Sequence, residues 1–420
     1  MTHFPKMDFS KFAMPKVDPA RTAQVMAAMA KLQKRQAAAY AKWADARRTT
    51  MHETSATAED GVIDMVAPST PGGSWTAPGP SSGRPEPSAF TGSQGDIAGD
   101  VMRTIRESLA RAGLGEGTGG IPCAPVPAPT PIPDGARFEE RTYSDAVGSR
   151  RYKVYVPSGY AGQALPVVVM LHGCTQDPDD FARGTRMNEV AEEQTFLVAY
   201  PEQPRSANMQ RCWNWYEPGD QRREGGEPAL IAGIARQVVA EFSADASRVY
   251  AAGLSAGGAA AAILATTHPD VFAAVGVHSG LACGSARDVP SAFAAMKGGG
   301  TAGSGGTQHR VPLIVFHGDG DRTVHAANGY EVAAQGLSGP GLTETFVEDR
   351  TPDGVAYTRT VRRDASGRAV LEHWVLRGGG HAWSGGSSAG SFTDARGPDA
   401  SREMARFFLA HANAADSVLP

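Results

Sequence analysis

The sequence predicts an α/β protein built on a doubly wound, mostly parallel sheet, with a helical or disordered N-terminal extension. Continuous apolar runs, typical of strands buried on both faces, alternate with helix-forming segments over residues 136–415. Before that region, prolines, glycines and serines are concentrated in 67–94 and 116–135, which indicates linkers. A glycine-flanked serine, Ser255, lies between one apolar run and the helix-forming run that follows it.

The alternation of strands and helices can be followed along residues 136–415. Alternating polar and apolar residues at 137–144 and 151–156 predict an antiparallel hairpin at one edge of the sheet. Buried strands are predicted at 165–171, 195–200, 249–254, 271–277, 311–316 and 371–376. Helices are predicted at 178–194, 228–242, 256–268 and 400–412, and 290–310 is expected to be a loop.

Residues 1–66 predict a basic amphipathic helical arm. Pro19 follows Asp18, as is typical of a helix start, and apolar residues then recur three and four apart from Val25 to Trp43. Lysines and arginines occupy the other faces, so the narrow apolar stripe needs its own domain, another helix or an apolar particle to cover it. The remaining predicted segments before the α/β region are a linker at 67–94, a short amphipathic helix at 95–115 and a Pro/Gly linker at 116–135.

Composition argues against several classes of function. The 420 residues include 40 Lys or Arg and 44 Asp or Glu, and this balance gives no sign of a nucleic-acid partner. No segment is long and apolar enough to be expected to span a membrane. The four cysteines form no CxxC pattern, so we expect neither a metal site nor a cofactor. The N-terminus lacks the apolar run of a secretory signal, and a cytoplasmic protein is therefore expected.

The segment Gly253-Leu254-Ser255-Ala256-Gly257 has the Gly-x-Ser-x-Gly pattern of a nucleophile elbow. In such an elbow the glycines let a strand and a helix approach closely and hold the serine in a strained, exposed position. The alternative is an ordinary serine in a glycine-rich turn. With a strand predicted before Ser255 and a helix after it, the pattern predicts a serine nucleophile on an α/β-hydrolase fold.

A serine nucleophile needs a base, and the base needs a carboxylate that orients it. In this fold the chain order is serine, acid, histidine, with the last two on loops at the carboxyl ends of strands. The predicted strand at 311–316 runs into a loop that contains Asp319 and Asp321. Asp321 is the preferred acid because it lies past the turn, and Asp319 is the alternative.

His381 is the predicted base. It lies at the tip of the glycine-rich loop 377–383, directly after a predicted strand, and the glycines allow the imidazole to approach the serine. His317 and His325, in the loop of the acid, are the alternatives.

Two backbone N–H groups are expected to form an oxyanion hole. One is that of Ala256, the residue after the nucleophile, and the second should come from a loop after an early strand. The loop 171–176 follows the buried strand at 165–171, and the N–H of Cys174 is the best second donor. Cys174 as a nucleophile is the competing interpretation, but no elbow pattern surrounds it.

Six blocks of sequence resemble the poly(3-hydroxybutyrate) depolymerase family of esterases, over about residues 136–412. They are LHGCTQ at 171–176, YPEQ at 200–203, CWNWY at 212–216, GLSAGG at 253–258, the acid loop at Asp321 and GGHAWSGG at 379–386. The resemblance implies hydrolysis of polyhydroxyalkanoate polymer or oligomers by a Ser255, His381 and Asp321 triad. Because feruloyl and acetylxylan esterases are related to this family, a carbohydrate esterase is the alternative function.

The resemblance also implies roles for residues around the triad. It places Cys174 at the oxyanion hole, and Trp213, Trp215 and Trp383 near the substrate. Cys174 and Cys212 stand where some secreted relatives look disulfide-linked, and the sequence leaves this pairing open. An extracellular location, as for secreted members of the family, is the alternative to a cytoplasmic one.

Residues 7–18 resemble the start of phasins, proteins that coat polyhydroxyalkanoate granules. The resemblance implies that residues 1–66 contact a granule surface. It also implies a third candidate function, a granule-associated binding protein whose hydrolase activity is secondary.

Overall fold

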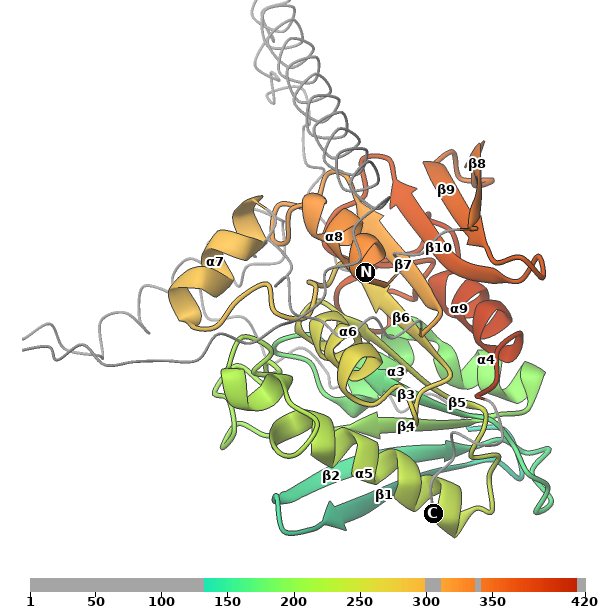
Figure 1. The fold of residues 1–420 in the computed structure, drawn as a ribbon. Helices are drawn as coiled ribbons and strands as arrows, with labels where there is room; N and C mark the ends of the chain where they lie inside the picture. The colour runs from blue at the N-terminus through green and yellow to red at the C-terminus, as the bar shows by residue number, and fades with distance from the viewer. Residues whose placement is uncertain (1–131, 299–310, 337–340, 414–420) are drawn as a thin grey trace, which may run out of the picture. The chain divides into compact units, whose positions relative to one another are not determined.

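The computed structural model describes residues 132–298, 311–336 and 341–413 (Figure 1). The arm predicted at 1–66, the linker at 67–94, the helix at 95–115 and nearly all of the linker at 116–135 lie outside the described residues. Within the described part of the chain, no helix has the length and apolar character needed to cross a membrane.

The centre of the described region is a ten-stranded sheet with the order β1-β2-β4-β3-β5-β6-β7-β10-β9-β8. Neighbours from β4 to β10 are parallel, whereas β1 and β2 at one edge and β9 and β8 at the other run antiparallel. The strands are β1 (Arg137–Ser144), β2 (Ser149–Val156), β3 (Val167–Leu171), β4 (Leu197–Pro201), β5 (Val249–Leu254), β6 (Ala274–His278), β7 (Leu313–Gly318), β8 (Thr343–Arg350), β9 (Ala356–Arg363) and β10 (Ala369–Leu376). The predicted α/β-hydrolase fold class, with its mostly parallel sheet, is confirmed.

Helices cover both faces of this sheet (Figure 1). They are α3 (Pro178–Thr185), α4 (Met187–Gln194), α5 (Gly226–Glu241), α6 (Ala256–Thr267), α7 (Val289–Gly298), α8 (Ala327–Gly336) and α9 (Ala400–Leu409). Side chains of α5, α6 and α8 pack in one core cluster, and those of α3, α4 and α9 pack in the other. Successive residues of β3 alternate between the two clusters, with Val167 and Val169 in the first and Val168 and Met170 in the second. A strand buried on both faces in this way requires the continuous apolar run seen in the sequence.

Strands β3 and β5 lie side by side, and the connections that follow them lead toward opposite edges of the sheet. After β3 the chain moves outward to β4, and after β5 it moves the other way to β6. Such a reversal creates a crevice at the carboxyl ends of the two strands, where ligands bind in open α/β sheets. Ser255 follows β5 and the loop with Cys174 follows β3, so both candidate groups lie at this switch point.

Three differences from the sequence prediction have a local physical reason. The helix predicted at 178–194 is two helices, α3 and α4, because Arg186 between them adopts a left-handed conformation with φ 58°. The loop predicted at 290–310 begins with α7, whose start is capped by Asp288 accepting the Ser291 N–H at 2.8 Å. The hairpin β8–β9 was not predicted, because every residue of β8 is exposed and the strand has no buried apolar face.

Candidate active site

Ser255 lies at the sharp turn between β5 and α6, with φ 58° and ψ −119°. A positive φ is costly for a residue with a side chain, and such strain is typical of a nucleophile elbow. Glycine is required next to it: a Cβ on Gly257 would lie 2.0 Å from the backbone oxygen of Leu171, and one on Gly253 would lie 2.3 Å from the Gly257 carbonyl. The elbow's strand and helix therefore approach closely, and the elbow packs directly against the end of β3.

The loop after β3 presents the backbone N–H of Cys174. The backbone N–H groups of the neighbouring residues already have acceptors. Gly173 N–H donates to Gln176 Oε1 at 2.9 Å, Thr175 N–H to Gln210 O at 2.6 Å, and Gln176 N–H to Gly173 O at 3.3 Å. Among the described residues, no acceptor takes the N–H of Cys174. This N–H is therefore available to bind an oxyanion.

Ala256 supplies the other expected N–H. It is the first residue of α6, so its N–H has no acceptor within the helix. The loop of Cys174 is close to the elbow, since a Cβ on Gly173 would lie 3.6 Å from the Ser255 Cβ. Both expected oxyanion donors thus lie beside the candidate nucleophile, and the positive end of the α6 dipole favours negative charge there.

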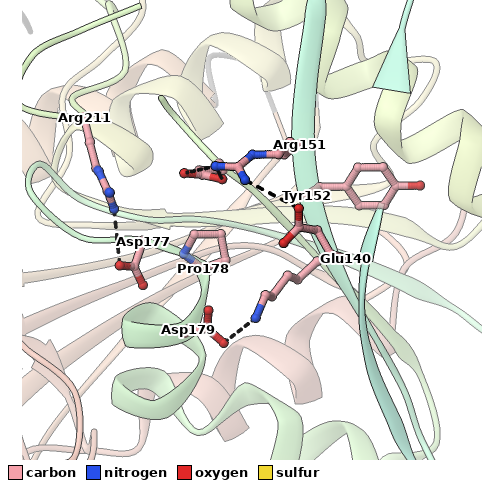
Figure 2. A pocket seen from close by; sticks show the side chains of 9 residues that line it. Glu140, Arg151, Tyr152, Asp177, Pro178, Asp179 and Arg211 are labelled. Atoms are coloured by element: carbon pink, nitrogen blue, oxygen red, sulfur yellow. Dashed lines mark hydrogen bonds and ion pairs between the residues drawn. The ribbon is translucent and has the colours of Figure 1, made fainter. Parts of the chain in front are cut away.

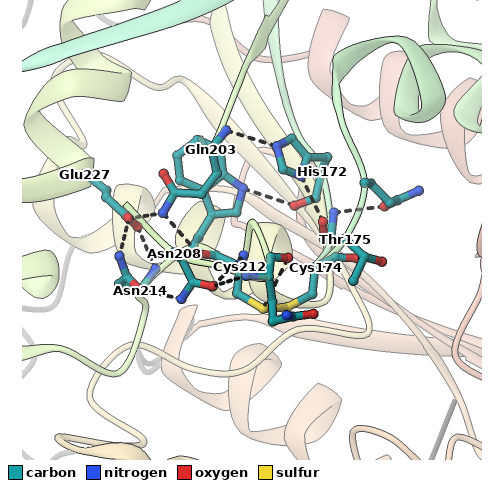
Figure 3. Close-up of a disulfide and its surroundings, with 12 residues drawn as sticks. His172, Cys174, Thr175, Gln203, Asn208, Cys212, Asn214 and Glu227 are labelled. Carbon is teal, nitrogen blue, oxygen red and sulfur yellow. Dashed lines mark hydrogen bonds between the residues drawn. A yellow bond between two sulfur atoms is a disulfide. The ribbon is translucent and has the colours of Figure 1, made fainter. Parts of the chain in front are cut away.

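Cys174 and Cys212 form a disulfide, with their Cα atoms 4.2 Å apart (Figure 3). The structure therefore decides a pairing that the sequence left open. It also removes the competing interpretation of Cys174 as a nucleophile, because the sulfur is bonded. The remaining described cysteine, Cys283, has a raised pKa because it is buried, which disfavours the reactive thiolate.

Asp321 and His381 are brought together by the loops after β7 and β10, which are parallel neighbours in the sheet. His381 Nδ1 lies 2.7 Å from Asp321 Oδ2. The other carboxylate oxygen accepts the N–H groups of Thr323 and Val324, both at 2.8 Å. With Nδ1–H donated to Asp321, the Nε2 lone pair of His381 is left to accept a proton.

The environment of Asp321 keeps it ionised. Burial raises the pKa of this carboxyl, but the charge and hydrogen bond of His381, with His317 and the Val324 N–H, lower it to a net value of about 2. Asp321 is therefore a carboxylate throughout the neutral range and stabilises positive charge on the His381 ring.

Asp319, the alternative acid, has partners other than the imidazole. Its carboxylate accepts the Gly378 N–H at 2.5 Å and lies 3.3 Å from the Arg377 guanidinium, in an exposed position. It thus anchors the start of the loop that carries His381.

The alternative bases also have other partners. His317 is buried, and its Nε2 lies 2.9 Å from Val324 O, while burial lowers its pKa. His325 Nδ1 accepts the N–H of Ala327 at 3.2 Å. Of the histidines considered, His381 is the one hydrogen-bonded to the candidate acid at 2.7 Å.

The tryptophans correct one prediction. Trp213 and Trp383 are 0% and 1% exposed, so neither presents a surface to substrate, contrary to the expected contact. Trp213 Nε1–H donates to His172 O at 3.0 Å, and Trp383 Nε1–H donates to Ser401 Oγ at 3.0 Å. Trp215 is also buried and packs edge-on against Tyr216. The three side chains pack within the core instead of lining a groove.

His278, at the end of β6, has a connecting role that the sequence did not reveal. Its backbone oxygen accepts the Ser255 N–H at 2.9 Å, and its Nε2 accepts the Ser384 N–H at 3.0 Å. The ring stacks on Trp383, and burial lowers its pKa to about 3, so it stays neutral and can accept. His278 thereby ties the elbow to the segment that follows His381. The sequence indicated only that His278 lies at the end of a predicted strand, which does not reveal these contacts.

A cavity of about 200 Å³ lies near the start of α3, beside β1 and β2 (Figure 2). Each of its cations is paired with a carboxylate: Arg151 pairs with Glu140 and Glu202, Lys153 with Asp179, and Arg211 with Asp177. The lining therefore already satisfies its cations and holds one carboxylate more than it has cations. In the described part of the chain, no group of three or more His, Cys, Asp or Glu side chains is arranged to hold a metal ion.

Comparison with known proteins identifies relatives of this region. Residues 150–354 match the family model Esterase PHB depolymerase. Poly(3-hydroxyalkanoate) depolymerase C of Paucimonas lemoignei is 33% identical over 54% of this chain and 57% of that protein. Feruloyl esterase B of Neurospora crassa is 35% identical over 31% of this chain and 44% of that protein. A probable acetylxylan esterase A of Neosartorya fischeri is 28% identical over 46% of this chain and 56% of that protein.

This chain spans about half the length of the curated relatives it matches. The family match runs from β2 past β8 and includes Ser255, Cys174 and Asp321, whereas His381 lies beyond its end. The resemblance seen in the sequence blocks and the family match agree. Residues 150–354 are therefore similar to the poly(3-hydroxybutyrate) depolymerase family of esterases.

Proposed function

We propose that this chain is a serine esterase in which Ser255, His381 and Asp321 form the catalytic triad. The observation that carries the proposal is the 2.7 Å contact between His381 and Asp321, on loops at the same sheet edge as the strained Ser255. A hydrogen-bonded imidazole and carboxylate next to an elbow serine are what acyl transfer requires. The match of residues 150–354 to the esterase family model supports the same reaction.

The proposed reaction passes through an acyl-enzyme. Ser255 Oγ attacks the carbonyl carbon of the ester, and His381 Nε2 takes the hydroxyl proton. The tetrahedral intermediate collapses as the bond to the alcohol oxygen breaks, and His381 returns the proton to that oxygen. Water then attacks the acyl carbon, His381 takes its proton, and the carboxylic acid leaves as Ser255 recovers its hydrogen. Asp321 stays ionised and holds the ring in place.

Negative charge on the carbonyl oxygen is proposed to be stabilised by the N–H groups of Ala256 and Cys174. Preorganised donors of this kind lower the barrier because they need not reorient when the charge develops. The N-terminus of α6 adds to the same field.

For the substrate we propose ester bonds of polyhydroxyalkanoate polymer or oligomers. The family match and the similarity to a poly(3-hydroxyalkanoate) depolymerase support this class. A feruloyl or acetylxylan carbohydrate esterase is the second candidate, supported by relatives with those names at similar identities.

A hydrolysis panel separates the two candidate substrates. The purified chain is assayed on 3-hydroxybutyrate oligomers, amorphous polyhydroxybutyrate granules, methyl ferulate and acetylated xylan. We expect kcat/KM to be at least about tenfold higher on the hydroxybutyrate oligomers than on the aromatic and acetyl esters. The reverse order would assign the chain to the carbohydrate esterases.

We also propose that residues 1–66 contact the surface of a polyhydroxyalkanoate granule. Their resemblance to phasins supports this, and a flexible tether raises the concentration of a linked domain at a surface. Deleting residues 1–66 is expected to lower the fraction bound to amorphous granules in a sedimentation assay, with kcat on soluble oligomers unchanged. Equal sedimentation of both proteins would contradict the proposal.

Fluorophosphonate labelling addresses the third candidate function. If the chain were a granule-binding protein with a silent hydrolase site, it would sediment with granules but would not react with a fluorophosphonate at Ser255. A cytoplasmic location, in contact with granules, remains our proposal. The Cys174–Cys212 disulfide supports the extracellular alternative, since disulfides persist in oxidising compartments.

A further inference from the structure

Glu227 is a buried acid on α5 that the proposed chemistry does not use. Its residue is 5% exposed, and its carboxylate accepts three hydrogen bonds (Figure 3). Oε1 accepts from Gln203 Nε2 at 2.5 Å and from Asn214 Nδ2 at 2.8 Å, and Oε2 accepts the Asn214 N–H at 2.7 Å. Burying a carboxylate is costly unless its oxygens are used in this way.

The partners of Glu227 belong to the two segments that hold the loop of Cys174. Gln203 donates its backbone N–H to His172 Nε2 at 3.1 Å. Trp213, which precedes Asn214, donates its Nε1–H to His172 O at 3.0 Å, and Cys212 is bonded to Cys174. Three contacts thus lead from these two segments to the residues just before and at the free N–H of Cys174.

His172 can receive the Gln203 N–H because it is neutral. Burial lowers its pKa to about 4, and its Nδ1 lies 2.8 Å from Gly173 O, to which it donates. Both ring nitrogens are therefore occupied, and the ring fixes the backbone immediately before Cys174.

We propose that Glu227 is a positioning residue for the oxyanion hole, an inference that rests on the esterase function proposed above. It fixes Gln203 and the 212–214 segment, and these hold His172 and Cys174 so that the Cys174 N–H points to the site of the oxyanion. Oxyanion donors act through their placement, so a displaced donor lowers kcat without weakening substrate binding.

The charge state of Glu227 provides a specific test. Burial and the charge of Asp220 raise the pKa of Glu227 to about 7, against the opposing effect of the Asn214 and Gln203 donors and Arg150. Tyr216 is the other titratable group near it, and its pKa is raised mainly by burial. Because the folded pKa lies above its usual value, the ionised form that accepts all three bonds becomes dominant only as pH rises through about 7.

The experiment compares Glu227→Gln with the full wild-type chain on a soluble p-nitrophenyl ester between pH 6 and 9. Glutamine has nearly the same shape as glutamate, but its NH₂ group replaces one of the two oxygens that accept hydrogen bonds from Gln203 and Asn214. We expect kcat to fall about 10- to 100-fold at pH 8.5, with KM changed less than about twofold. The ratio of wild-type to variant kcat should increase with pH through about 7.

Two further variants keep the test independent of folding. Trp213→Phe removes the Nε1–H donated to His172 O. If both residues position the same loop, the fold-decrease in kcat of the double variant should be smaller than the product of the fold-decreases of the two single variants. Glu192→Gln is the matched control: this helix carboxylate accepts from Tyr155 OH at 2.7 Å and from Ser158 N–H at 3.1 Å, and does not contact the oxyanion loop. We expect its kcat to stay within about twofold of wild type.

A folded Glu227→Gln protein with wild-type kcat, or with a loss that is the same at every pH, would overturn the inference. Fluorophosphonate labelling of wild type keeps this result distinct from a failure of the esterase proposal. If wild type is labelled at Ser255 but the ratio of wild-type kcat to Glu227→Gln kcat does not change with pH, only the positioning role is contradicted. If wild type is not labelled at all, the esterase function itself falls, and the role of Glu227 with it.

Discussion

Replacement of Ser255 by alanine is expected to lower kcat for ester hydrolysis by about 10³- to 10⁶-fold. The hydroxyl is the atom that forms the acyl bond, so the covalent route ends when it is removed. The fold should be retained, because Ser255 Oγ is not needed for the elbow geometry, which depends on Gly253 and Gly257. Turnover of a p-nitrophenyl ester and covalent labelling by a fluorophosphonate measure the loss.

Ser279→Ala is the matched control for this experiment. Ser279 also follows a parallel strand, β6, with a positive φ of 49°, but it is fully buried and its Oγ lies 3.2 Å from His278 Nδ1. Its loss should change kcat only a few-fold, and labelling should persist. Labelling that survives Ser255→Ala would show that another residue is the nucleophile.

Asp321→Asn is expected to lower kcat by about 10³- to 10⁴-fold. An amide in place of the carboxylate no longer stabilises positive charge on His381, and its NH₂ group favours the tautomer with the proton on Nε2. That tautomer cannot take the proton of Ser255. The measurement is kcat at pH 8 together with the melting temperature, which separates lost catalysis from lost folding.

The neighbouring Asp319 provides the control for Asp321. It lies in the same loop but pairs with Arg377 and the Gly378 N–H at the surface. Asp319→Asn should keep kcat within a few-fold, because exposed ion pairs contribute only about 0–1 kcal/mol to stability. A large loss in Asp319→Asn with a small one in Asp321→Asn would reverse the assignment of the acid.

Much of the fold followed from local patterns in the chain. The run Val249–Leu254 is buried on both faces, and the Ala-rich helix α6 follows it, so the elbow at Ser255 could be predicted without tertiary information. The polar strand β8 could not be predicted, since its partner β9 stabilises it and no buried face marks it. The break at Arg186 was missed because its left-handed backbone occurs at a residue that usually disfavours it.

Within the candidate site, the chain order and the strand ends led to Ser255, Asp321, His381 and the N–H of Cys174 as candidates. The structure places these residues at one edge of the sheet, because the carboxyl ends of parallel strands meet there whatever the sequence distance between them. The tryptophans were misjudged for the opposite reason. A conspicuous aromatic residue near a motif is equally suited to packing and to ligand contact, and only burial distinguishes the two.

The sequence by itself determined the class of this protein, because the elbow, the buried strands and the family blocks are local features that each short segment carries. Tertiary structure decided what depends on distant segments meeting: the Cys174–Cys212 bond, the hydrogen bond between Asp321 and His381, the contacts of His278 with Ser255 and Ser384, and the hydrogen bonds of Glu227. Each of these requires two groups that are separated along the chain to come within a few ångströms. Such proximity is a property of the packed sheet and helices, and no spacing along the chain encodes it.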